Sequence, residues 1–230
     1  MKTPFTDRRT AGRLLARRLT QYRQHPRVLV LALPRGGVPV GLEVAQYLQA
    51  PLDVFVVRKL GLPGHEEFAM GAVASDGIRV LNAEVVHKFR IPKSIIDAVT
   101  ERERDELHRR EEVYGANRFA ADATGRIVIL VDDGMATGSS MEAAVAALRQ
   151  RAPEKIVVAV PVTAPETFVR FCSIADEVVA VLTPDSFSSV GEWYEEFPQL
   201  SDEDVHELMA QAQVLPSANR HHEFPHQYHS

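Results

Sequence analysis

Residues 128–140 read VILVDDGMATGSS, a pattern typical of a strand and the turn after it in an α/β fold. Its apolar start continues a predicted strand, Ile127–Val131, that is hydrophobic enough to be buried on both faces of a parallel sheet. Two acids, Asp132 and Asp133, follow directly at the carboxyl end of that strand. Ligands of open α/β sheets bind at the carboxyl ends of strands, so the acid pair stands at the edge where chemistry is expected.

The turn after the strand combines a diol grip with an anion cradle. Ionised Asp132 and Asp133 only accept hydrogen bonds, which suits the vicinal hydroxyls of a ribose. Glycines let the backbone turn tightly and aim its N–H groups inward, beside the hydroxyls of the turn and the N-terminus of the next helix. The cradle residues are Gly134, Met135, Ala136, Thr137, Gly138, Ser139 and Ser140. Together the two parts describe a site for ribose 5-phosphate.

Strands and helices alternate on both sides of this stretch. This rhythm predicts an α/β fold with a doubly wound, mainly parallel sheet flanked by helices. The further predicted strands are Arg27–Leu33, Leu52–Arg58, Lys155–Val160 and Glu177–Leu182, and the helices between them are Val38–Leu48, Ser139–Arg151 and Pro165–Ile174.

Three further elements are predicted around this core. An amphipathic helix opens the chain at Thr6–Gln24, with Thr6 or Asp7 as its N-cap. A small β-hairpin pairs Ala69–Ala74 with Ile78–Leu81. A charged helix covers Pro92–Tyr114. We expect one domain over residues 1–213 and a flexible, polar, His-rich tail over residues 214–230.

Composition narrows the classes of partner. The 230 residues carry 26 basic and 31 acidic side chains, a net charge of −5, which gives no general attraction to nucleic acids or anionic membranes. Cys172 is the single cysteine, so neither a disulfide framework nor a thiolate metal cluster is expected. The sequence shows no signal-peptide core and no apolar run of membrane length. The expected setting is the cytoplasm, without nucleic-acid or membrane partners.

A second turn lies at the carboxyl end of an earlier strand. In Leu33–Gly37 (LPRGG), Gly36 and Gly37 allow close backbone approach, and Arg35 offers a bidentate grip on an anion. Arg58 and Lys59 end the next predicted strand on the same side of the sheet. The two turns therefore supply opposite halves of a site for one phosphorylated ligand.

The apolar strand, acid pair and Thr-Gly turn resemble the phosphoribosyl-diphosphate signature of type I phosphoribosyltransferases. The resemblance extends over roughly residues 27–200 and is greatest to the bacterial stand-alone predicted phosphoribosyltransferase group. It implies a dimeric enzyme that uses 5-phosphoribosyl 1-diphosphate and Mg²⁺, transfers ribosyl 5-phosphate to a nitrogenous base and releases pyrophosphate. It also implies that Asp132 and Asp133 act on the metal and the ribose, with Arg35 completing the catalytic set.

The resemblance also suggests roles for other segments. Leu33–Gly37 would be the pyrophosphate loop, with a cis peptide at Arg35–Gly36, and Arg58 and Lys59 would lie near the pyrophosphate. Residues 184–200 would form a hood over the acceptor. In that hood Phe187 and Trp193 would stack on the base, with Val190 or Gly191 giving backbone contacts, although the rings could equally plug the end of the sheet.

The sequence departs from part of the family pattern at two places, and one alternative function stays open. Ala136 stands where 6-oxopurine enzymes have an Asp, and no Lys follows the strand that ends in VPVTAP, which disfavours hypoxanthine or guanine as acceptor. The rival is a non-catalytic protein of the same fold that senses phosphoribosyl diphosphate.

Overall fold

Alternate residues of the central strands face opposite sides of one parallel sheet. The structure, a computed structural model, describes residues 5–115 and 123–213. The sheet has the order β2-β1-β6-β7-β8, and every pair in it is parallel. Its strands are β1 (Val28–Ala32), β2 (Leu52–Val54), β6 (Ile127–Val131), β7 (Lys155–Val162) and β8 (Glu177–Leu182). The predicted α/β fold is confirmed.

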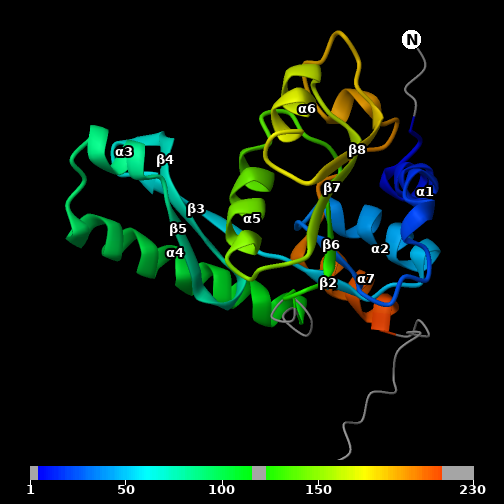
Figure 1. The fold of residues 1–230 in the computed structure, drawn as a ribbon, viewed down its shortest axis with the longest axis horizontal. Coiled ribbons are helices and arrows are strands. Elements are labelled where there is room, and N and C mark those ends of the chain that lie inside the picture. The colour runs from blue at the N-terminus through cyan, green and yellow to red at the C-terminus, as the bar shows by residue number, and fades with distance from the viewer. Residues whose placement is uncertain (1–4, 116–122, 214–230) are drawn as a thin grey trace, which may run out of the picture.

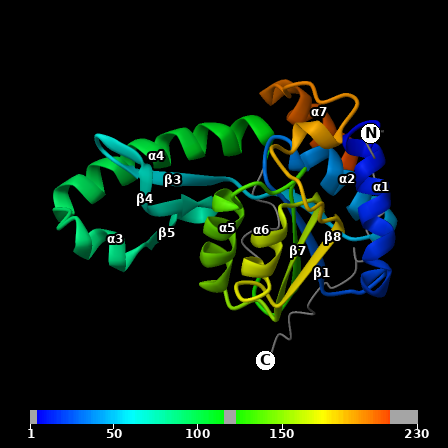
Figure 2. The same cartoon turned by 90° about the horizontal axis from the view of Figure 1, so that it is seen from above.

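Helices cover both faces of this sheet (Figures 1 and 2). Val30 and Ile129 point to the face covered by α1 (Arg8–Arg18), α2 (Gly37–Leu48) and α7 (Asp202–Gln213). Leu31 and Leu130 point to the other face, where α5 (Ser139–Arg149) and α6 (Pro165–Phe171) pack. Burial on both faces explains why these strands are continuously apolar in sequence.

A second, antiparallel sheet forms an arm beside the main sheet (Figure 1). It pairs β3 (Val57–Leu62), β4 (His65–Ala74) and β5 (Ile78–Leu81) and is accompanied by α3 (Ala83–Lys88) and α4 (Lys93–Tyr114). The predicted hairpin is present as β4 and β5, joined through the 3₁₀ turn Ser75–Gly77. Of the third strand, β3, only Val57 and Arg58 were predicted, as the end of the strand Leu52–Arg58.

The predicted strand Leu52–Arg58 is wrong as a single element. Its first part is β2, which ends at Val54, whereas Arg58 belongs to β3 of the arm. Phe55 and Val56, which lie between the two strands, are buried in different cores, so the apolar pattern continues while the chain changes sheets. Ser75 fixes this crossing, because its N–H donates to the Val56 carbonyl (2.9 Å) and its hydroxyl accepts from the Val56 N–H (3.1 Å).

The chain ends differ in part from the prediction. The opening helix is shorter than predicted, and Asp7 is its N-cap, accepting from the Thr10 N–H at 2.6 Å. Helix α7 was not predicted. Residues 184–200 form an irregular segment with one 3₁₀ turn, and Tyr194 pairs with Phe5 ahead of α1. The tail over residues 214–230 lies outside the described residues. Within residues 5–115 and 123–213, no helix is long and apolar enough to cross a membrane.

Candidate active site

Two turns meet at one edge of the main sheet. Strands β1 and β6 are hydrogen-bonded neighbours that pair Ala32 with Val131, so the segments that follow them emerge side by side. A Cβ on Gly36 would lie 1.9 Å from Asp133 Oδ2, and one on Gly37 would lie 2.7 Å from the Val131 carbonyl oxygen. These approaches require glycine, and they bring the LPRGG turn directly against the acid pair.

The first turn contains a cis peptide, but one residue earlier than predicted. The cis bond joins Pro34 to Arg35, not Arg35 to Gly36. Gly36 instead adopts right-handed helical angles and is the N-cap residue of α2. The Arg35 side chain is 36% exposed, and its guanidinium lies 3.6 Å from the carboxylate of Asp202 on α7.

The acid pair is held from several directions. Asp132 Oδ1 accepts from the Asp133 N–H at 2.8 Å, and burial together with the charge of Asp133 raises the pKa of the Asp132 carboxyl well above its usual range. Asp133 Oδ2 accepts from Nε of Arg8 at 2.8 Å. The Tyr194 hydroxyl donates to the Asp133 carbonyl at 2.5 Å, and burial raises the pKa of this phenol.

The second turn continues into the N-terminus of α5. Gly138 is its N-cap residue with φ of +67°, and a Cβ there would lie 2.5 Å from the ring of Phe171, so both the backbone angle and the space require glycine. The Thr137 and Ser139 hydroxyls are 3.0 Å apart. The turn thus places two hydroxyls and a helix N-terminus together, as an anion cradle requires.

Side chains of α6 and strand β7 brace this turn. The Thr167 hydroxyl donates to the Ala136 carbonyl at 2.5 Å, and Arg170 donates to the Thr137 carbonyl. Met135 extends the pairing with β7, because its N–H donates to the Val162 carbonyl at 2.9 Å. The Met135 N–H therefore has a protein acceptor, which leaves the N–H groups nearer the helix as the candidates for an anion.

Two pockets open beside these turns. One of about 510 Å³ is lined by Ala136, Thr137, Ala164, Glu166, Thr167, Arg170, Phe187 and Ser188. The other, of about 320 Å³, is lined by Arg8, Arg35, Gly36, Asp133, Phe197, Pro198, Gln199 and Leu200. The first is lined by Ala136 and Thr137 of the second turn, and the second is lined by two cations, Arg8 and Arg35, and by Asp133.

The predicted hood residues Phe187, Val190 and Trp193 all pack against one hydrophobic cluster. Phe187 also lines the pocket that contains Ala136 and Thr137. Trp193 and Val190 pack in a cluster with Phe5 and Tyr194, and Val190 also fills the space next to Gly134. These contacts match the alternative in which hydrophobic side chains plug the end of the sheet.

Arg58 and Lys59 lie on the arm and not at the end of a main-sheet strand. Two guanidinium nitrogens of Arg58 donate to one carboxylate oxygen of Glu103 on α4, at 3.0 and 2.6 Å. Lys59 is exposed on β3. The structure thus gives Arg58 an acidic partner on the arm instead of a place in either turn.

Sequence reasoning missed three residues that contact the predicted set. Arg8 and Tyr194 both contact Asp133. Asp202 contacts Arg35. Tyr194 belonged to a recognised aromatic segment, but Arg8 was one of many arginines in an amphipathic helix. Nothing in the local sequence distinguishes it.

Comparison with known proteins gives one consistent family. The family model described as "Phosphoribosyl transferase domain" matches residues 8–171. The chain is 48% identical over 201 residues to proteins from two strains of Mycobacterium tuberculosis, each named a "Putative phosphoribosyl transferase". The match covers 87% of this chain and 45% of each relative, so the chain spans about half the length of the curated relatives it matches.

A solved structure agrees with this result. The crystal structure of the protein TT1426 from Thermus thermophilus is 45% identical, with a TM-score of 0.81. The match covers 90% of this chain and 98% of that one. Both turns lie within residues 8–171, the range that the family model matches.

Proposed function

The chain belongs to the phosphoribosyl transferase domain family, and on that premise we propose that it uses 5-phosphoribosyl 1-diphosphate with Mg²⁺. The ribosyl 5-phosphate group is transferred to a nitrogenous base and pyrophosphate is released. Asp132 and Asp133 accept hydrogen bonds from the ribose hydroxyls, while the Thr137–Ser140 turn binds the 5-phosphate. Arg35 and the N–H groups of its turn bind the diphosphate.

One observation carries this proposal: the acid pair lies directly against the LPRGG turn. The space beside Asp133 Oδ2 admits Gly36 only because that residue has no side chain. A ligand with a diol at the acids, one phosphate at the cradle and a second at Arg35 matches the arrangement of the two pockets. Phosphoribosyl diphosphate has these three groups on one sugar.

The proposed chemistry needs positioning more than covalent assistance. Displacement at the anomeric carbon passes through an oxocarbenium-like transition state, in which negative charge builds up on the leaving diphosphate. Arg35 and the turn N–H groups stabilise that charge, and the fixed acids hold the sugar in line with the acceptor. The bond from the anomeric carbon to the diphosphate oxygen breaks as a bond to the base nitrogen forms, and the proton of that nitrogen passes to the released pyrophosphate or to water.

The donor set fits magnesium. Mg²⁺ favours oxygen ligands and usually keeps waters and substrate oxygens with only one or two carboxylates. Asp132 and Asp133 supply such a pair, and no group of three or more metal-binding side chains occurs within the described ranges. When bound with the donor, the ion would neutralise charge on the diphosphate.

The acceptor is proposed to bind in the pocket beside Phe187. This pocket combines an aromatic ring with the Glu166 and Thr167 side chains of α6, next to the cradle. Ala136 provides no acidic group there, in keeping with an acceptor other than a 6-oxopurine. A cytoplasmic, dimeric protein completes the proposal, and light scattering on the purified chain tests the dimer.

Calorimetry and turnover test the proposal in sequence. Phosphoribosyl diphosphate should bind the folded protein with Mg²⁺ and bind much more weakly with EDTA. A panel of nucleobases with labelled donor should then yield a labelled nucleotide and pyrophosphate. Binding without turnover on any base would favour the non-catalytic sensor. Absence of binding at millimolar donor would contradict both the transferase and the sensor.

A further inference from the structure

We propose that Arg8 is a positioning residue that holds the Asp133 carboxylate for the ribose and ties it to the end of the hood segment, residues 184–200. Arg8 lies in the first turn of α1, 125 residues before its partner. The inference rests on the proposed function, because it assigns to Arg8 a part in how the donor's sugar is gripped.

Three contacts fix the Arg8 guanidinium. Its Nε donates to Asp133 Oδ2 at 2.8 Å, and one terminal nitrogen donates to the Pro198 carbonyl at 2.8 Å. Its central carbon lies 3.7 Å from the centre of the Phe197 ring, a cation–π contact. The Arg8 side chain is 9% exposed, so this is a buried charge with two of its nitrogens in hydrogen bonds of defined geometry.

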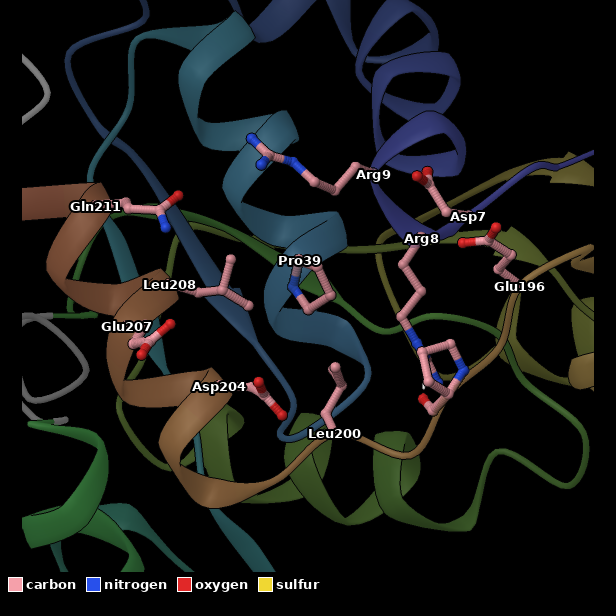
Figure 3. A pocket seen from close by; sticks show the side chains of 11 residues that line it. Asp7, Arg8, Arg9, Pro39, Glu196, Leu200, Asp204, Glu207, Leu208 and Gln211 are labelled. Atoms are coloured by element: carbon pink, nitrogen blue, oxygen red, sulfur yellow. Dashed lines mark hydrogen bonds between the residues drawn. The ribbon is translucent and has the colours of Figure 1, made fainter.

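The side chain connects parts of the molecule that are far apart in sequence. Figure 3 shows Arg8 leaving α1 and reaching the chain segment that carries Glu196 and Leu200. It lines a pocket of about 270 Å³ on this side and also the pocket that contains Arg35 and Gly36. Arg8 therefore forms part of the wall between the candidate site and the α1–α7 surface.

The contact with Arg8 occupies one carboxylate oxygen of Asp133, and we infer that the other binds the ligand. Oδ2 is directed at Arg8 and is also the atom that a Cβ on Gly36 would meet first. Within the described residues no hydrogen bond reaches Oδ1. The guanidinium thus sets the plane of the carboxylate and leaves one oxygen available to a ribose hydroxyl.

The same contact offsets charge in a crowded place. Asp132 and Asp133 are consecutive acids at the end of a buried strand, and two ionised carboxylates on neighbouring residues repel each other. Arg8 contacts Asp133 of this pair directly, whereas Arg35 pairs with Asp202. Without Arg8, Asp133 would have to turn toward solvent or toward another donor.

A purely structural role for Arg8 makes a different prediction. The contacts with Phe197 and Pro198 could serve only to anchor the end of the hood segment. In that case replacing Arg8 would lower stability and weaken every ligand similarly. If Arg8 acts through Asp133, the loss should be confined to ligands that carry the diol and should vanish when Asp133 is already altered.

A double-mutant cycle on the full chain separates these roles. Ribose 5-phosphate and inorganic pyrophosphate are titrated, with Mg²⁺, into wild type, Arg8→Gln, Asp133→Asn and the double variant. We expect Arg8→Gln to weaken ribose 5-phosphate binding roughly 10- to 100-fold, the range found when supporting residues of a site are removed. In the Asp133→Asn background it should have almost no further effect.

Two further variants complete the experiment. Arg9→Gln is the matched control, because Arg9 is next in α1 and pairs with Glu43 at 2.6 Å, away from the acid pair; it should bind both ligands like wild type. Arg8→Lys keeps the charge but lacks the fork that reaches Asp133 and Pro198 together, so its affinity should be intermediate. It also serves if Arg8→Gln fails to fold.

The outcomes are distinguishable. Additive effects of Arg8 and Asp133 substitution, or equal losses for ribose 5-phosphate and pyrophosphate, would overturn the positioning role while leaving the proposed function intact. Failure of wild type to bind either ligand would instead refute the proposed function.

Discussion

The two turns of the candidate site hold their charged side chains in different ways. Asp133, after β6, is fixed through its carboxylate by Arg8 and through its carbonyl by Tyr194, and its side chain is 14% exposed. Arg35, after β1, is 36% exposed and has an acidic neighbour, Asp202, at 3.6 Å. The acids are therefore braced by buried partners, whereas the arginine has a longer and more accessible contact.

This difference suits the two halves of the proposed ligand. A sugar that must stay in line for displacement benefits from fixed acceptors, because reorganisation during the reaction is then small. A diphosphate that must enter and leave benefits from a cation that can exchange one partner for another. We expect substitutions after β6 to act on geometry and substitutions at Arg35 to act on charge.

The largest effect is expected at the acid pair. Replacing both Asp132 and Asp133 by Asn exchanges acceptor oxygens for donors, and each lost charge-assisted bond is worth about 1.5–3 kcal/mol. Donor affinity or kcat/KM should fall on the order of a hundredfold or more. Pyrophosphate makes no diol contact and should bind with far less change. Wild-type donor binding by a folded double variant would show that the motif is only a capped turn.

Arg35→Ala should have the next largest effect and the opposite selectivity. Loss of one charge-assisted contact should weaken the diphosphate donor and pyrophosphate by roughly 10- to 100-fold. Ribose 5-phosphate, which lacks the diphosphate, should bind nearly as it does to wild type. Calorimetry with the three ligands measures these affinities. Equal losses for all three would contradict the assignment of the diphosphate to the Arg35 turn and of the sugar phosphate to the turn after β6.

Gly36→Ala tests how closely the turns depend on each other. Its Cβ would overlap Asp133 Oδ2, so that carboxylate must move away from Arg8, at a cost of about 1–3 kcal/mol. Because the displaced carboxylate no longer faces the ribose, Gly36→Ala should also weaken the binding of ribose 5-phosphate. In Gly37→Ala the clash is with backbone at Val131, which cannot move aside, so thermal melts should show a greater stability loss there than at Gly36.

The smallest effect is expected for Asp202→Asn. Hydrogen bonds from Tyr114 and Arg109, partly opposed by burial, lower the pKa of the Asp202 carboxyl in the folded protein. A lowered pKa stabilises the fold above the usual pKa of Asp, and this contribution is lost as pH falls. The variant should lose about 0–1 kcal/mol at pH 7, and the difference from wild type should shrink below about pH 4. A constant difference in urea melts across pH would contradict this.

Local patterns predicted the fold and the chemical character of both turns. The continuous apolar strands and the Asp-Asp and Gly-Gly pairs act through neighbours in sequence, so the chain itself displays them. The strand Leu52–Arg58 was misread because Phe55 and Val56 are buried in two different cores where the chain changes sheets. Apolar composition records burial but not which sheet provides it.

The contacts that brace the site could not be predicted in this way. Arg8 meets Asp133 across 125 positions and Tyr194 meets it across 61, so both contacts exist only once α1 and the hood segment pack on the sheet. The cis bond at Pro34–Arg35 also lies one residue from its predicted place. Residue types at a strand end predict where a site lies, while contacts from distant elements decide how firmly each of its side chains is held.

The chain's one tryptophan makes the hood visible to spectroscopy. Trp193 packs beside Val190, Phe5 and Tyr194, and its Nε1 is buried without a hydrogen-bond partner among the described residues. Indole emission shifts to longer wavelengths when the ring gains contact with water. Because no other indole contributes to the signal, a change in emission colour on adding a ligand would report on this segment alone, in solution and without any attached dye.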